Sequence, residues 1–89
     1  MVRYRLLVSG TVQGVGFRYH VKYAARLLQL TGWVRNLDSG DVEIEVQGPP
    51  DDVDQFLAEV RWGSRYAQVD EVRLKRLEPL LEHGFEVTG

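Results

Sequence analysis

The spacing of hydrophobic residues switches between a two-residue and a helical period along the chain, and this alternation most limits the fold. Apolar and polar residues alternate in Val2–Val12, as in a strand with one buried face. From Phe17 to about Leu28, apolar residues recur at i, i+3, i+4 and i+7, as on one face of a helix. The same patterns predict a strand over 33–37, a strand over 42–46, a helix over 50–62, a strand over 69–77 and a short final strand over 85–87.

Turn-forming residues separate these segments. Thr31-Gly32 is expected to break the first helix, and Gly48-Pro49-Pro50 ends the strand before the second helix. In the strand over 69–77, Val72 and Leu74 are expected to face inward. Gly63 is expected to end the second helix.

The predicted element order is β-α-β-β-α-β, with room for a fifth strand at the end. This is the split βαβ, ferredoxin-like arrangement of the α+β class. It predicts an antiparallel sheet with two helices on one face. A chain of 89 residues fits one domain, so residues 1–89 are expected to form a single unit. The pattern does not determine how the last strand pairs.

Charge is distributed unevenly along the chain, although the net charge is only −2. Residues 1–35 carry six basic side chains and no acidic one, whereas all 13 acids follow later. The basic residues are Arg3, Arg5, Arg18, Lys22, Arg26 and Arg35. Either the first half meets an anion, or the two halves interleave and neutralise each other.

A glycine-containing loop joins the first strand to the first helix. Gly14 and Gly16 allow backbone geometries that place N–H groups on one concave side. The helix start near Phe17 adds unpaired N–H groups and a positive dipole end, and Arg18 lies at that end. These features suit a phosphate-sized anion; the alternative is a plain β–α turn with a surface arginine. The loop has neither the Walker pattern nor the dinucleotide fingerprint.

Asn36 is a polar residue late in the second predicted strand. Taken alone, it is best interpreted as preparing the turn at Asp38-Ser39-Gly40.

The two segments together resemble the signature motifs of the acylphosphatase family. The first is Gly14-Val15-Gly16-Phe17-Arg18 preceded by Gly10, Val12 and Gln13, and the second is Gly32-Trp33-Val34-Arg35-Asn36 followed by Gly40, Val42 and Gly48. The resemblance covers essentially the whole chain. It implies that Arg18 binds the substrate phosphate and that Asn36 positions water. It also implies a phosphate cradle formed by the backbone of Gln13, Gly14, Val15, Gly16, Phe17 and Arg18.

Some positions depart from that family pattern without touching the two motifs. Gln29 stands where many relatives close the first helix with glycine, which could cost up to about 1 kcal/mol. The stretch Gly63–Gln68 lacks an expected Gly-Pro pair, and the tail lacks a terminal aromatic residue.

The candidate site contains no nucleophile of the usual kinds. The chain has no cysteine, and Ser9 has no Asp–His pair placed to activate it. His20 and His83 are interpreted as surface residues. The acidic positions, interpreted as solvated surface and not as metal ligands, are Glu43, Glu45, Asp51, Asp52 and Asp54. We therefore expect neither a metal nor a cofactor.

An acyl phosphate needs little chemical assistance, because its leaving group is a carboxylate that is already stable as an anion. The hypothesis is catalysis by positioning and charge stabilisation. Arg18 and the loop N–H groups would hold the phosphoryl oxygens, and Asn36 would orient a water in line with phosphorus. A substrate phosphate oxygen would take the proton, giving a carboxylate and inorganic phosphate.

Two alternatives differ in what the site does. One is a non-catalytic module that binds an acyl phosphate or carbamoyl phosphate for a larger enzyme. The other is an RNA-binding domain of the same fold, which is disfavoured because the strand over 42–47 presents Glu43 and Glu45 and no aromatic residue.

No apolar run approaches the roughly 20 residues of a membrane span. We expect a cytoplasmic monomer with an open site that takes inorganic phosphate or sulfate.

Overall fold

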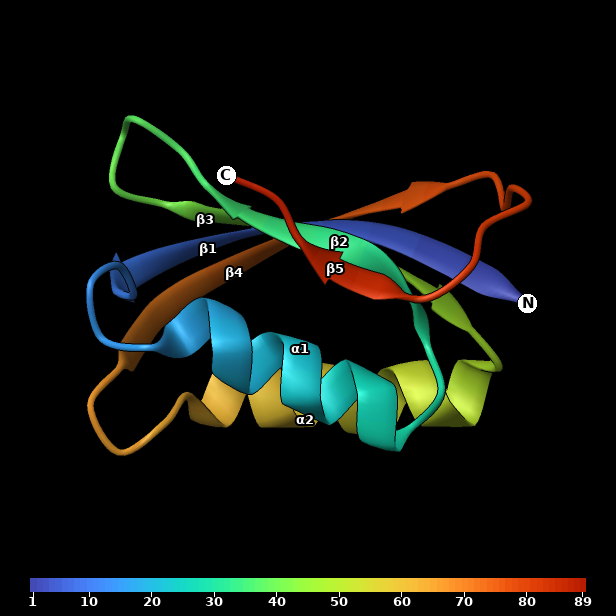
Figure 1. Cartoon of the computed structure of the whole chain (residues 1–89), viewed down its shortest axis with the longest axis horizontal. Coiled ribbons are helices and arrows are strands. Elements are labelled where there is room, and N and C mark those ends of the chain that lie inside the picture. Colours follow the sequence, from blue (N-terminus) through green and yellow to red (C-terminus); the bar gives the residue numbers. More distant parts are fainter.

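The computed structural model describes residues 1–89 and contains two helices and five strands (Figure 1). The elements are β1 (Val2–Thr11), α1 (Phe17–Leu27), β2 (Thr31–Asn36), β3 (Val42–Gly48), α2 (Pro50–Trp62), β4 (Gln68–Leu77) and β5 (Phe85–Val87). This order confirms the ferredoxin-like α+β fold. Several boundaries differ by one or two residues. Thr31 and Gly32 already belong to β2, which ends at Asn36, and β3 continues through Gly48.

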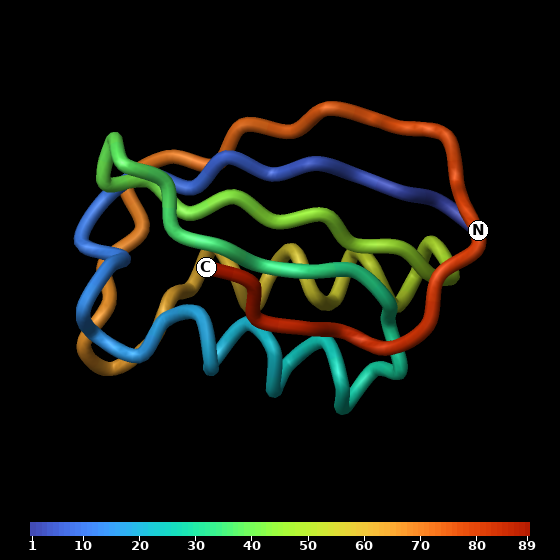
Figure 2. Tube along the Cα trace, turned by 45° about the horizontal axis from the view of Figure 1, so that its top comes forward, coloured from blue at the N-terminus to red at the C-terminus, as the bar shows by residue number.

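The strands form one sheet in the order β4-β1-β3-β2-β5. The four longer strands pair antiparallel, as expected, but β5 pairs parallel with β2. The prediction of a wholly antiparallel sheet is therefore wrong at this one edge. After β4, the chain crosses to the opposite edge along the end of the sheet where β2 begins, so β5 runs in the same direction as β2 (Figure 2).

Both helices cover the same face of the sheet, and the core lies between the two layers (Figure 1). The apolar stripe of each helix faces inward, as the sequence period predicts. Side chains exposed by 1% or less come from both layers and include Leu6, Val34, Ile44, Phe17, Val21 and Phe56. Phe85 of β5 is also fully buried, with its ring 6.2 Å from that of Phe56, which anchors the last strand to the core.

The edge strand β4 is less buried than the sequence pattern predicts. Val72 is partly buried against the core, but 41% of Leu74 is exposed. Leu74 is paired with the fully buried Leu6 and so takes the inward face, as predicted, but the core covers it only in part. Because β4 is at the edge of the sheet, no further strand covers its outer side.

Ion pairs, and not solvated carboxylates, cover the face of the sheet away from the helices. Glu43 is only 5% exposed and contacts Arg5 at 2.5 Å and Arg35 at 2.6 Å, while Glu45 binds the buried Arg3 at 2.8 Å. The expectation of solvated Glu43 and Glu45 is therefore wrong. The cause is β-sheet register, because Arg5 and Arg35 are on the strands that flank Glu43.

These contacts determine the pKa of the Glu43 carboxyl. Burial, the largest single influence, raises the pKa, but the hydrogen bonds from Arg35 and Arg5 and the positive charges of these two side chains together outweigh it. The pKa of Glu43 therefore lies below its ordinary value of 4.5.

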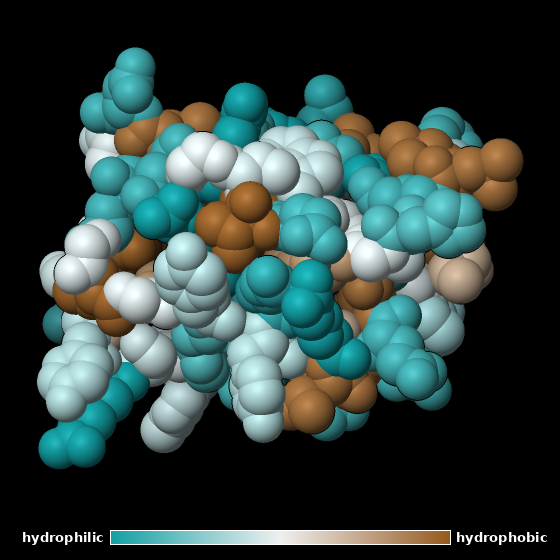
Figure 3. Space-filling view, viewed as in Figure 1, coloured by the Kyte–Doolittle hydropathy of each residue, from teal (hydrophilic) through white to brown (hydrophobic).

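The surface on the side of α1 and β5 shows small apolar patches separated by hydrophilic groups (Figure 3). Exposed single apolar side chains are normal in folded proteins. Neither helix has the length and apolar character needed to cross a membrane.

Candidate active site

The two sequence motifs meet at one end of the molecule. The β1–α1 connection, which carries the glycine loop, and the β2–β3 hairpin, which follows Asn36, lie at the same end of the sheet (Figure 2). β3 lies between β1 and β2, so the two segments approach each other across a single strand.

The glycine loop requires its glycines for their backbone conformation. Gly14 has φ +74° and Gly16 has φ +77°, values in the left-handed region that L side chains rarely adopt. A side chain at either position would meet no atom within 4 Å, so space does not exclude one. Backbone conformation is therefore the constraint, and the loop stays open to solvent on this side.

The loop leaves a series of main-chain donors unpaired. The carbonyl of Gly16 accepts from the N–H of His20 at 3.1 Å, which begins the hydrogen bonding of α1. The main-chain N–H groups of residues 14–19 donate to no other main-chain or side-chain group. No acidic side chain lies in the first turn of α1 and no side chain caps it. The positive end of the helix is therefore available to an anion.

The predicted cradle residues differ in what they present. The side chain of Phe17 is buried in the core, and the side chain of Val15 is partly buried and packs against that core. Gly14 and Gly16 are exposed. From these four residues, only main-chain groups are available to an anion.

Arg18 and Asn36 reach one common acceptor. Arg18 Nη1 donates to the main-chain carbonyl oxygen of Gly89 at 2.6 Å, and the main-chain N–H of Asn36 donates to the same oxygen at 3.3 Å. The structure thus brings together the two residues to which the family resemblance gives catalytic roles. The contribution of Gly89 was not predicted, because nothing in the sequence indicated how the chain after β5 would run.

The side chain of Asn36 has an unpaired acceptor. Its Oδ1 is buried and has no hydrogen-bond partner in the chain. Buried polar atoms are usually paired with protein or water, so this oxygen has the capacity to accept a hydrogen bond from a bound molecule.

Gln13 uses its side chain to bind the hairpin. Its Nε2 donates to the carbonyl oxygen of Leu37 at 2.7 Å and to that of Asp41 at 2.9 Å. Both donors of the amide are therefore occupied. Any contact between Gln13 and a phosphate group would come from the main chain.

Most of the early basic side chains are paired with acids in the structure, and two of them, Arg18 and Lys22, form no ion pair. Arg3, Arg5, Arg26 and Arg35 each pair with acids from the second half of the chain. Interleaving therefore accounts for four of the six early cations. Arg18 forms no ion pair, and it is the cation beside the unpaired N–H groups of the loop.

His20 is not the surface residue that the sequence suggested. It is partly buried, its ring lies 6.4 Å from that of Phe17, and its Nε2 is buried without a partner. The residue borders a hollow between the helices with Gln55 and Glu59 of α2. Its position on α1 one turn after Phe17 directs it toward the second helix. His83 is exposed, as expected.

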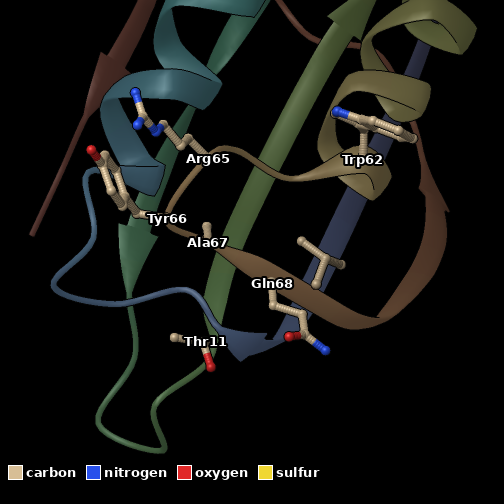
Figure 4. Close-up of a pocket in the computed structure, with 7 residues that line it drawn as sticks. Thr11, Trp62, Arg65, Tyr66, Ala67 and Gln68 are labelled. Carbon is tan, nitrogen blue, oxygen red and sulfur yellow. The ribbon is translucent and has the colours of Figure 1, made fainter.

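Neither Arg18 nor Asn36 lines any of the four surface hollows of the molecule. One hollow, of about 440 Å³, borders the end of β1 next to the glycine loop (Figure 4). Thr11 comes from β1, Trp62 from α2, and the other labelled residues from the α2–β4 connection and the start of β4 (Figure 4). The candidate site is thus an open surface and not an enclosed cleft.

The site combines a guanidinium, a series of free N–H groups and an unpaired amide oxygen. The first two suit a phosphoryl group, and the third suits a water molecule. No group of three or more His, Cys, Asp or Glu side chains gathers anywhere in the structure in a way that could hold a metal ion.

Comparison with known proteins links this geometry to one family. The family model described as acylphosphatase matches residues 4–87. The acylphosphatase of Clostridium beijerinckii is 48% identical over 82 residues, which are 92% of this chain and 90% of that protein. The crystal structure of acylphosphatase from Bacillus subtilis superposes with a TM-score of 0.96 and 39% identity, and the match covers the whole of both chains.

A longer protein also contains a similar unit. Full-length HypF, solved in a phosphate- and nucleotide-bound form, matches with a TM-score of 0.89 and 32% identity. That match covers this whole chain but only 12% of the HypF chain. Similar folds therefore occur both in proteins of this length and within much larger ones.

Proposed function

The chain belongs to the acylphosphatase family and is a hydrolase of acyl phosphates, and we propose that Arg18 and Asn36 divide the catalytic work between them. Arg18 and the loop N–H groups hold the phosphoryl group. Asn36 orients the attacking water. The observation that carries this proposal is the shared acceptor, because Arg18 and Asn36 donate to one oxygen atom although they belong to different motifs.

Phosphate binding combines a side chain with the backbone. One guanidinium N–H of Arg18 contacts Gly89, and the planar fork has further donors for phosphoryl oxygens. The N–H groups of Gly14, Val15, Gly16, Phe17 and Arg18 complete the cradle at the positive end of α1. These donors are fixed before substrate arrives, so little reorganisation is needed as charge develops in the transition state.

Water activation rests on Asn36. Its Oδ1, which has no partner in the chain, accepts a hydrogen from the water once the carboxamide turns to expose it, and the water oxygen is then directed at phosphorus, opposite the leaving oxygen. The new P–O bond forms as the bond to the acyl oxygen breaks. The acyl group leaves as a carboxylate, which requires no general acid. The water proton passes to a phosphoryl oxygen, and the second product is inorganic phosphate.

We extend the proposal to the setting of the enzyme. Residues 1–89 form a single domain that works as a cytoplasmic monomer, without a metal or cofactor, and binds phosphate or sulfate in the absence of substrate. The absence of cysteine is compatible with a reducing compartment. The alternative of a binding module within a larger system is disfavoured by the relatives of similar length, such as that of Clostridium beijerinckii.

Inhibition by inorganic phosphate tests the division of roles. Steady-state hydrolysis of benzoyl phosphate is measured at several phosphate concentrations for the wild type, Arg18→Ala and Asn36→Ala. We expect Arg18→Ala to raise the inhibition constant of phosphate strongly. We expect Asn36→Ala to lower kcat by about 10²- to 10³-fold while leaving that constant nearly unchanged. Equal effects of both variants on phosphate inhibition would contradict separate roles.

A further inference from the structure

Gln13 connects the two motifs through one side chain. It lies in the β1–α1 connection, four residues after the bulge at Ser9/Gly10 in β1. Its two Nε2 hydrogen bonds reach the carbonyls of Leu37 and Asp41, at 2.7 and 2.9 Å. These carbonyls are on the two arms of the β2–β3 hairpin.

Gln13 binds the β2–β3 hairpin where the two strands end and the turn begins, as the hydrogen bonds within the hairpin show. The N–H of Leu37 donates to Asp41 O at 2.9 Å, and the N–H of Gly40 donates to Leu37 O at 3.1 Å. Both carbonyls therefore accept from the hairpin itself and from Gln13. The amide of Gln13 bridges the two arms at the point where the turn begins.

Asn36 lies directly next to this bridge. It precedes Leu37 and pairs with Val42, which follows Asp41, so the Gln13 contacts come immediately after the last ladder pair of β2 and β3. The Asn36 carboxamide is not held by a hydrogen bond within the chain, and its Oδ1 is buried without a partner. Its orientation depends on the backbone that carries it, and Gln13 restrains that backbone.

We infer that Gln13 is a positioning residue, which sets the location of Asn36 relative to the phosphate loop through its hydrogen bonds to Leu37 and Asp41. The inference rests on the proposed function, because it assigns Gln13 an effect on the water that Asn36 orients. Gln13 acts through the hairpin and need not touch the reacting atoms. Loss of its side-chain donors should therefore slow the chemical step without weakening phosphate binding.

One substitution removes the two hydrogen bonds of the Gln13 side chain with little change in packing. Gln13→Met keeps the length of the side chain but cannot donate a hydrogen bond. Each carbonyl keeps its partner within the hairpin, so no buried acceptor is orphaned. Gln13→Ala serves as a second variant in case the thioether repacks the loop.

Gln47 offers a matched control at the other end of the sheet. Its Nε2 donates to Leu80 O at 2.8 Å, and its Oε1 accepts from the N–H of Leu80 at 2.9 Å. It therefore restrains a connecting segment through two side-chain-to-backbone bonds, as Gln13 does, and its Oε1 also accepts from Arg3 Nη1 at 3.2 Å. Gln47→Met should reduce stability and leave kcat unchanged.

A double-mutant cycle between Gln13 and Asn36 tests the inference. For benzoyl phosphate hydrolysis we expect Gln13→Met to lower kcat about 10- to 100-fold, because small misplacements of a positioned group have effects of this size. The phosphate inhibition constant should change less than about twofold. In the Asn36→Ala background, the same substitution should lower kcat by less than about threefold, because the group that it positions is gone.

Three results would overturn the inference. One is a Gln13→Met enzyme with the kcat of the wild type. Another is the same fold-loss with Asn36 present and absent, which would show that Gln13 does not act through Asn36. The third is a raised phosphate inhibition constant, which would place Gln13 in phosphate binding. A wild-type rate in Asn36→Ala alone would instead reject the proposed function, so the two failures are distinguishable.

Discussion

Arg18 and Asn36 donate hydrogen bonds to the same oxygen atom, that of Gly89, although they are 18 positions apart in the sequence and lie on different elements. Arg18 is in the first turn of α1 and Asn36 is the last residue of β2. The shared contact means that the helix start and the strand end lie beside each other. Asn36 makes this contact through its main-chain N–H and not through its carboxamide, so the contact places the end of β2 next to the Arg18 guanidinium.

The first prediction concerns binding without turnover. Inorganic phosphate should raise the melting temperature of the wild type, because a ligand that binds only the folded state stabilises it by about 2.7 kcal/mol at 100 times Kd. Differential scanning fluorimetry with increasing phosphate measures this shift. Arg18→Ala should show a much smaller shift at the same concentrations. Equal shifts in both proteins would place the phosphate elsewhere.

The second prediction concerns the loop backbone. Gly16→Ala should destabilise the fold by about 1–2 kcal/mol, because an L residue is strained at φ +77°. It should also weaken phosphate inhibition, since relief of the strain would move the N–H groups of the cradle. Gly84→Ala, at φ +72° and away from the site, should show similar strain with unchanged phosphate inhibition. Urea unfolding and inhibition assays separate the two effects.

The third prediction concerns the end of α1. The N–H of Gln29 donates to Arg26 O, and that of Leu30 donates to Ala25 O, which is the Schellman pattern with a non-glycine residue at φ +55°. Gln29→Gly should therefore raise the free energy of unfolding by up to about 1 kcal/mol. Denaturant titration measures the change. A clearly destabilised variant would mean that the Gln29 side chain makes a compensating contribution.

Much of the architecture was predictable because local patterns agree with the fold. Both helices and the four longer strands follow from hydrophobic period and turn residues. The pairing of β5 was not predictable, since three residues carry too little periodicity to indicate a partner. The exposure of Leu74 was not predictable either, because alternation shows which face a side chain takes but not how well an edge strand is covered.

The motifs indicated which residues to propose for the site but not how these residues are arranged. Arg18 and Asn36 were identified by motif, whereas the roles of Gly89 and of the Gln13 side chain depend on tertiary placement. Glu43 looked like a solvated carboxylate because strand alternation does not reveal cross-strand partners. In the structure, Arg5 and Arg35 flank it from the two neighbouring strands.

The fourth prediction follows from the lowered pKa of Glu43. A group with a depressed pKa in the folded state stabilises above its unfolded value, here 4.5, and loses that contribution as pH falls through its folded pKa. Glu43→Gln should cost about 1–3 kcal/mol at pH 7, and this cost should shrink as the pH falls below 4.5. Urea unfolding at pH 7 and at pH 3 measures the difference.

Glu86→Gln is the control for this effect. Glu86 pairs with Arg26 at 3.2 Å on an exposed surface, so its loss should change stability little at either pH. A Glu43→Gln cost that stays the same from pH 7 to pH 3 would contradict the assigned ionic role.

The most direct test of the central claim is the rate of benzoyl phosphate hydrolysis by the wild type and by Arg18→Ala, measured with EDTA present. Circular dichroism confirms that both proteins are folded. The account predicts steady turnover by the wild type that EDTA does not reduce, and a loss of about 10³-fold or more in Arg18→Ala. A folded Arg18→Ala that hydrolyses benzoyl phosphate at the wild-type rate would contradict the account.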